Sequence, residues 1–120
     1  MPIKNFKDIF AWQKAHQLAL LVYKLTKKYP KDELYGLVSQ SRRAVVSVAS
    51  NLVEGFKRLG TQEDLHFCNI AQASLEELRY QLFLAKDLGY ITQQEFLGAE
   101  NLSEETAKLI HLWIKNKNKK

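Results

Sequence analysis

Residues 40–58 read QSRRAVVSVASNLVEGFKR, and this stretch decides the fold. Its apolar residues recur every three or four positions, as they do along one face of an α-helix. Six polar residues recur with the same spacing and form a second face, which we call the polar stripe: Gln40, Arg43, Ser47, Asn51, Glu54 and Arg58. At about 100° and 1.5 Å per residue, the polar stripe covers an arc of roughly 80° and a length of roughly 27 Å.

Three interpretations of the polar stripe are open: a solvent face, a buried polar network that fixes helix register, or part of a binding surface. Periodicity does not separate a solvent face from a buried polar seam. Solvent faces favour long charged side chains, whereas Ser47 and Asn51, at the centre, each lose about 0.5 kcal/mol of helix propensity relative to Ala. A matching polar set lies farther along the chain, at Ser74, Glu77 and Gln81. We therefore favour a polar network between two helices that fixes their register.

Such a network would contain ion pairs. Arg43 is a candidate partner for Glu77, and Glu54 for Arg58 or for a neighbouring helix. Gly55, beside the polar stripe, costs roughly 1 kcal/mol of helix stability relative to Ala. This glycine indicates either a close approach by another backbone or ring, or a simple kink.

The same periodicity continues on both sides of this stretch. It predicts helices at about 8–29, 32–58, 61–88 and 92–114, followed by a basic tail at 115–120. Connections this short require antiparallel neighbours, so we expect one all-α domain, an antiparallel up-down-up-down four-helix bundle.

Residues at the expected helix ends support these boundaries. Pro30 ends the first helix and Asp32 is a plausible N-cap for the second. Gly60 and Gly89 are expected to close helices in the left-handed conformation. Thr61 with Asp64, and Thr92 with Glu95, have the spacing of a capping box at the start of the third and fourth helices.

Apolar residues on the second helix cover about twice the arc that its own core needs. Four residues make up this excess: Tyr35, Val46, Ala49 and Val53. Soluble monomers rarely leave large apolar patches exposed, so we expect these residues to form an interface between copies of the chain.

The formal charge of +5 is concentrated at one end of the chain. Four lysines lie in the last six residues, and without them the charge is only +1. Lysines and arginines that could neutralise phosphates are candidate contacts for RNA or DNA: Lys24, Lys27, Lys28, Arg42, Lys57, Arg58, Lys115, Lys117, Lys119 and Lys120. The alternative is that the tail only keeps the protein in solution.

The sequence predicts no catalytic, cofactor or metal site. It contains no nucleophile or phosphate-binding motif, and its Glu-x-x-His at 63–66 lacks the second copy that a di-iron bundle needs. The single Cys68 is typical of a small core residue in a reducing compartment. No apolar run approaches the roughly 18 residues that span a bilayer, so we expect a cytoplasmic protein without membrane contact.

Several segments resemble one protein family. The most specific is Ser47-x-x-x-Asn51-x-x-Glu54-Gly55, followed by Ser74-x-x-Glu77-Leu78. Supporting segments are Trp12-Gln13-Lys14-Ala15, Tyr29-Pro30, Glu33-Leu34-Tyr35-Gly36-Leu37 and Leu88-Gly89-Tyr90-Ile91. Together they are similar to the bacterial four-helix-bundle proteins encoded in intervening sequences of 23S rRNA genes, over nearly the whole chain. One departure is Ala73 before Ser74, where the family commonly has glycine.

The resemblance implies a homopentameric ring whose role is poorly defined and is suspected to involve nucleic acid. Relatives include the accessory variability determinant of diversity-generating retroelements, which partners a reverse transcriptase and its RNA. We therefore expect a non-enzymatic, homo-oligomeric bundle that binds nucleic acid without reading its sequence. The alternative is a protein-interaction scaffold or accessory subunit, for example of a reverse transcriptase, without direct nucleic-acid contact.

Overall fold

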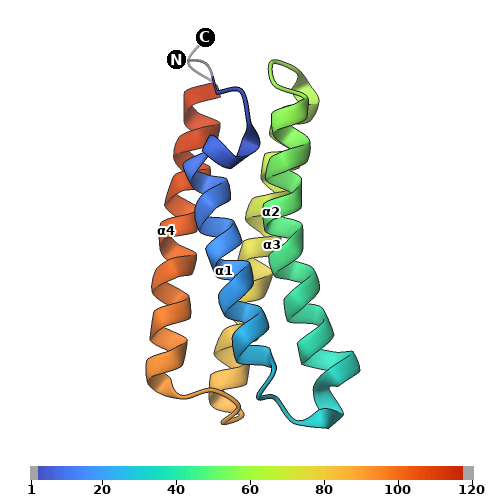
Figure 1. The fold of residues 1–120 in the computed structure, drawn as a ribbon, viewed down its shortest axis with the longest axis vertical. Helices are drawn as coiled ribbons and strands as arrows, with labels where there is room; N and C mark the ends of the chain where they lie inside the picture. Colours follow the sequence, from blue (N-terminus) through green and yellow to red (C-terminus); the bar gives the residue numbers. More distant parts are fainter. Residues whose placement is uncertain (1–2, 118–120) are drawn as a thin grey trace.

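Four long helices stand side by side in the computed structural model, which describes residues 3–117, with the backbone alone at 117 (Figure 1). They are α1 (Phe10–Thr26), α2 (Ser39–Lys57), α3 (Gln62–Asp87) and α4 (Gln93–Lys117). Successive helices are antiparallel, so the first and last described residues lie at the same end (Figure 1). The expected all-α four-helix bundle is confirmed, and it measures 47 × 25 × 19 Å.

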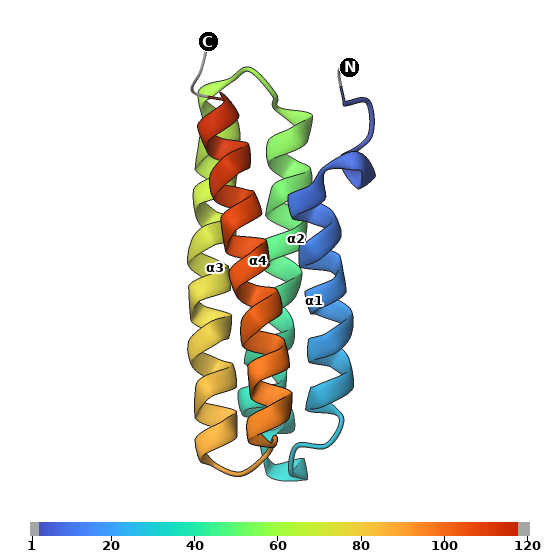
Figure 2. The same cartoon turned by 90° about the vertical axis from the view of Figure 1, so that its left-hand side faces the viewer.

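Each helix packs against two others, with α1 and α3 at opposite corners. Both contact α2 and α4, and Figure 2 shows α4 in front of the space between α3 and α1. The core between them is aliphatic, and burial of each such side chain stabilises the fold by about 1.5–3 kcal/mol. Its fully buried members include Leu18, Val45, Leu52, Leu78, Leu82 and Ile110.

The segment before α2 differs from the expected continuous helix at 32–58. Lys31–Glu33 form a 3₁₀ turn, η2, and Leu34–Val38 form a π-helical turn, η3. Gly36 departs from helical geometry, with φ −109° and ψ −109°. The side chain of Glu33, rather than Asp32, caps this turn, because its Oε1 accepts a hydrogen bond from the Leu37 N–H at 3.1 Å.

The first helix is shorter than the expected 8–29. A 3₁₀ turn, η1 (Phe6–Asp8), precedes it, and the Asn5 side chain accepts a hydrogen bond from the Lys7 N–H at 2.9 Å. After Thr26 the backbone tightens, with the Lys28 N–H bonded to the Leu25 carbonyl and the Tyr29 N–H to the Thr26 carbonyl. Turns of this kind satisfy backbone groups that a helix end leaves without partners.

Of the two expected capping boxes, the structure forms the second. The Thr92 N–H donates to Glu95 Oε1 at 2.9 Å, and the Glu95 N–H donates to Thr92 Oγ1 at 3.0 Å. The first does not form, because Thr61 Oγ1 bonds the Arg58 carbonyl instead and Asp64 is buried against α2. The left-handed glycines are confirmed, with φ of 88° at Gly60 and 81° at Gly89.

Candidate functional site

The centre of the polar stripe joins α2 to α3. Ser47 Oγ lies 2.8 Å from Ser74 Oγ across the two helices. Asn51 Nδ2 donates to the Ser47 carbonyl at 2.8 Å and to Ser47 Oγ at 3.0 Å. All three side chains are half-buried. At this level of the bundle the polar stripe is a seam between helices.

The ends of the polar stripe face solvent, since Gln40, Arg43 and Glu54 are exposed. Arg58 pairs with Glu54 at 2.7 Å on the same helix, and its Nε lies 3.7 Å from Glu63 Oε2.

The expected pair between Arg43 and Glu77 is not formed among the residues that the structure describes. Both side chains are exposed on different helices, and Glu77 accepts a hydrogen bond from Gln81 Nε2 at 3.0 Å. The polar stripe is therefore a seam at its centre and a solvent face at its ends.

A close approach between α2 and α3 lies at Gly55. A Cβ atom there would meet Asp64 Oδ1 at 2.9 Å, the Asp64 carbonyl oxygen at 3.2 Å and Cys68 Sγ at 3.5 Å. Both Asp64 and Cys68 are buried. Of the two explanations that the sequence leaves open for Gly55, the close approach is confirmed.

The candidate phosphate contacts divide between the two ends of the bundle. Lys24, Lys27 and Lys28 lie where α1 ends, and Arg42 lies in the adjacent first turns of α2 (Figure 1). Lys57, Arg58 and Lys115 lie at the opposite end, where α2 and α4 finish. The side chain of Lys117, and the whole of Lys119 and Lys120, lie outside the described residues. One copy of the chain therefore presents two separate basic regions.

Several of these cations already have partners within the chain. Lys28 forms an ion pair with Glu95, and Arg58 pairs with Glu54. The Arg42 guanidinium lies 4.5 Å from the centre of the Tyr23 ring and donates from Nε to Thr26 Oγ1 at 2.9 Å. The exposed lysines at 24, 27, 57 and 115 are better placed to meet a polyanion.

The residues expected at an interface between copies differ in exposure. Tyr35, in η3 rather than α2, is 90% exposed, and Val46 is 45% exposed. Ala49 and Val53 are half-buried, and Ala49 packs against the core. The chain therefore covers part of the expected apolar excess itself, and Tyr35 and Val46 remain as its exposed part.

A shallow depression of about 420 Å³ lies beside Val46, between α1 and α2. It is lined by Tyr23, Arg42, Arg43, Val46, Ser47 and Ser50, a set with two cations and no acid. A second depression, of about 400 Å³, is mainly apolar and lies where Phe10 approaches Leu112 and Trp113 on α4.

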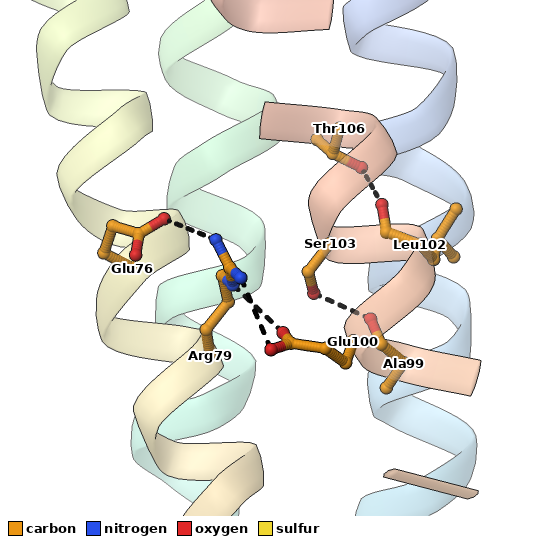
Figure 3. Close-up of polar contacts among 7 residues, drawn as sticks. All are labelled: Glu76, Arg79, Ala99, Glu100, Leu102, Ser103 and Thr106. Atoms are coloured by element: carbon orange, nitrogen blue, oxygen red, sulfur yellow. Dashed lines mark hydrogen bonds and ion pairs between the residues drawn. The ribbon is translucent and has the colours of Figure 1, made fainter. Parts of the chain in front are cut away.

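Two polar contacts between elements are absent from the sequence-based expectations. Arg79 on α3 holds Glu100 on α4 through two hydrogen bonds, at 3.0 and 3.3 Å, and also bonds Glu76 at 3.1 Å (Figure 3). These contacts raise the pKa of Arg79, with the hydrogen bond to Glu100 as the largest cause. Ser103 and Thr106, on the same stretch of α4, bond carbonyls of their own helix (Figure 3). Arg79 and Glu100 are 21 residues apart in sequence and lie on different helices. The spacing of residues within one helix therefore does not predict their contact.

The second contact joins two connecting segments at the end of the bundle opposite the first and last described residues (Figure 1). Tyr90 Oη donates to Glu33 Oε2 at 2.8 Å. The Leu37 N–H, and then the Tyr90 hydroxyl, lower the pKa of the Glu33 carboxyl. Nearby, burial and then the negative charge of Glu95 raise the pKa of Tyr29 to about 12.

Side chains that could bind a metal are dispersed. Within residues 3–116, no group of three or more His, Cys, Asp or Glu side chains could hold a metal ion. In the same part of the chain, no helix has the length and apolar character needed to cross a membrane.

Comparisons with known proteins agree with this architecture. A crystal structure at 1.70 Å of a protein of unknown function from the S23 ribosomal protein family of Bacteroides thetaiotaomicron is similar to this chain, with a TM-score of 0.79 and 26% identity. The alignment covers 91% of this chain and 98% of that one. A comparison with curated proteins finds no match. The model of the 23S rRNA-intervening sequence protein family matches residues 7–112, so the chain belongs to that family.

Proposed function

We propose that this protein is a non-enzymatic, cytoplasmic helical bundle that assembles with copies of itself and binds RNA or DNA loosely at its basic ends. The observation that supports self-association is the exposure of Val46 beside Arg42 and Arg43, together with the exposure of Tyr35 in η3. Apolar and aromatic groups beside arginine are typical of interface centres. The family resemblance suggests a pentamer.

Light scattering on the purified protein tests self-association. We expect a mass that is a multiple of 13.9 kDa at micromolar concentration, and about 70 kDa for five copies. A mass of one chain over the whole concentration range would contradict the proposal.

The exposed lysines at 24, 27, 57 and 115 support loose binding of a polyanion. A ring would repeat each of them in every copy, and several weak contacts on one nucleic acid strengthen one another. The test is an electrophoretic titration with RNA and with duplex DNA at low salt. Binding that weakens as salt rises, with little dependence on sequence, is expected. A titration without any shift would remove nucleic acid from the proposal.

The second candidate is a protein-interaction scaffold without direct nucleic-acid contact. It is favoured by the cations that are already engaged within the chain, namely Lys28, Arg42 and Arg58. The resemblance to the accessory variability determinant suggests a reverse transcriptase as one partner. Pull-down from lysate separates the candidates, because a partner retained after nuclease treatment favours the scaffold and one lost favours nucleic acid.

A further inference from the structure

Two neighbouring helices expose faces of opposite charge. We call Arg43, Val46, Ser50 and Lys57 the α2 face, since all four are exposed and recur with helical spacing. We call Glu63, Ala73, Glu77 and Tyr80, all exposed on α3, the α3 face. The acid on the outer side of α2, Glu54, is already paired with Arg58 at 2.7 Å, and Glu63 lies 3.7 Å from the same guanidinium, which leaves Glu77 as the unneutralised acid of the α3 face. The α2 face is therefore basic and the α3 face acidic.

The centres of both faces are small and uncharged. Val46 and Ser50 occupy the middle of the α2 face, and Ala73 lies in the middle of the α3 face. Small side chains allow two helices to approach closely, with charged side chains at the margins. An ordinary solvent face would carry long charged residues in these central positions.

The contact between Ser47 and Ser74 gives a common reference point for positions along α2 and α3, because the two Oγ atoms are 2.8 Å apart. Arg43 precedes Ser47 by four residues, and Glu77 follows Ser74 by three. Since α2 and α3 are antiparallel, both lie in the same direction along the bundle, at about 6 and 4.5 Å from that contact.

Distances from the serine contact also match toward the other end of the bundle. Lys57 lies about 15 Å from the serine contact and Glu63 about 16.5 Å from it, again in a common direction. Each cation of the α2 face is thus level with an acid of the α3 face, to within about 1.5 Å.

Rotation about a symmetry axis leaves height along that axis unchanged. In a closed ring whose bundles stand parallel to the axis, every copy of Arg43 is therefore level with every copy of Glu77. A head-to-tail contact between different faces of identical chains is the type of contact that closes rings. Arg43 and Glu77, which do not pair with each other in the described part of one chain, would then meet between neighbouring chains.

We propose that the α2 face of one copy packs antiparallel against the α3 face of the next copy. Arg43 pairs with Glu77 at one end of a centre formed by Val46, Ser50 and Ala73. At the other end Lys57 faces Glu63, which Arg58 of its own chain already contacts at 3.7 Å. This inference rests on the self-association proposed above, and it names the two surfaces and their register.

Charge reversal tests the pairing. Arg43→Glu and Glu77→Arg each place like charges opposite one another, so each should raise the concentration needed for half-assembly by at least about tenfold. The double variant restores opposite charges and should assemble near the wild-type concentration. The measurement is light scattering over a dilution series, with thermal unfolding followed by circular dichroism to show that each variant folds.

Matched controls come from exposed residues of α4. Lys108→Glu and Glu104→Arg make the same charge changes away from both faces and should leave the assembled mass unchanged. A wild-type protein that is a monomer throughout would overturn the self-association itself. A wild-type oligomer that both single variants preserve would overturn only this assignment of surfaces. Loss of assembly in both single variants without rescue in the double variant would overturn the pairing of Arg43 with Glu77.

Discussion

At the scale of single residues, Gly55 has little room for a side chain. A methyl group there would lie 3.2 Å from a backbone carbonyl of α3, which cannot rotate away as a flexible side chain can. The sequence indicates that a glycine inside a helix needs a reason. It does not say which atom approaches, because Asp64 reaches this position only after α2 and α3 have packed.

Gly55→Ala should destabilise the protein by about 1–3 kcal/mol, since overpacking outweighs the gain of roughly 1 kcal/mol in helix propensity. The free energy of unfolding in denaturant measures this. Gly98→Ala is the matched control, because nothing lies within 4 Å of the added methyl group. That variant should be stabilised by about 0.4–1 kcal/mol, and a comparable gain at Gly55 would contradict the close approach.

Tyr29 has a buried hydroxyl that accepts and donates no hydrogen bond among the described residues. Because burial raises its pKa from 10.0 to about 12, the fold favours the neutral phenol. Its contribution to stability is intact below pH 10 and is lost as the pH rises toward about 12.

Tyr29→Phe should leave stability at neutral pH unchanged or slightly higher, because it removes a buried polar group without a partner. It should also lessen the loss of stability at alkaline pH, measured by denaturation at several pH values. Tyr35→Phe, at a residue that is 90% exposed, is the control and should change neither property. An equal alkaline loss in the Tyr29 variant and the wild type would show that another group causes it.

At the scale of elements, the sequence predicts the contacts within α2 well. It predicts poorly the contacts of α2 that depend on how another helix packs against it. The pairing of Glu54 with Arg58 follows from their spacing within one helix. The sequence predicts the hydroxyl contact between Ser47 and Ser74 only as part of a network, and within the described part of the chain Arg43 pairs with no acid. Whether a polar residue meets another helix or solvent depends on helix rotation, which spacing leaves undetermined.

The link between Ser47 and Ser74 should appear as a coupling energy. Ser47→Ala, Ser74→Ala and the double variant form a cycle, for which we expect a coupling of about 0.5–1.5 kcal/mol in the free energy of unfolding. Ser50→Ala in place of Ser47→Ala gives the control cycle, because the Ser50 hydroxyl donates to the carbonyl of Val46 on its own helix and, among residues 3–116, to no group of α3. Full additivity in the first cycle would contradict a direct hydrogen bond.

The hydrogen bond between Glu33 of η2 and Tyr90 of the α3–α4 loop should make stability depend on pH. The lowered pKa of Glu33 means that its charged form stabilises the fold, so its contribution is present at neutral pH and is lost as the pH falls below about 4.5. Glu33→Gln should be less stable than the wild type at pH 7 and should lose less stability on acidification. Denaturation at pH 7 and at a pH below about 4.5 would measure both effects. Glu104→Gln is the control for an exposed acid, and identical acid losses in Glu33→Gln and the wild type would refute the assignment.

At the scale of the whole molecule, charge is distributed more evenly than the net value suggests. Both ends carry exposed lysines, and pairs such as Lys28 with Glu95 neutralise some of the cations. Sequence shows how many cations there are and that many lie near the C-terminus. Their separation into two regions follows from the antiparallel topology, which places the ends of α1 and α2 at opposite ends of the bundle.

The salt dependence of RNA binding should report how many lysines take part. Each phosphate contact contributes about 0.9 to the slope of log affinity against log salt on a duplex, and about 0.7 on a single strand. Deleting residues 115–120 should lower this slope if the tail contacts phosphates. Lys24→Gln with Lys27→Gln tests the other end in the same way, and slopes unchanged in both variants would exclude the two regions.

An even number of antiparallel helices brings the first and last described residues to one end of the bundle (Figure 1). A fluorophore attached at the first or the last described residue would therefore lie at the end of the bundle where α2 finishes at Lys57, opposite the contact between Glu33 and Tyr90. Energy transfer between such labels on different copies would then report how closely these ends of the bundles approach one another in an assembly. The opposite end, with its exposed Tyr35, would remain free of any attachment.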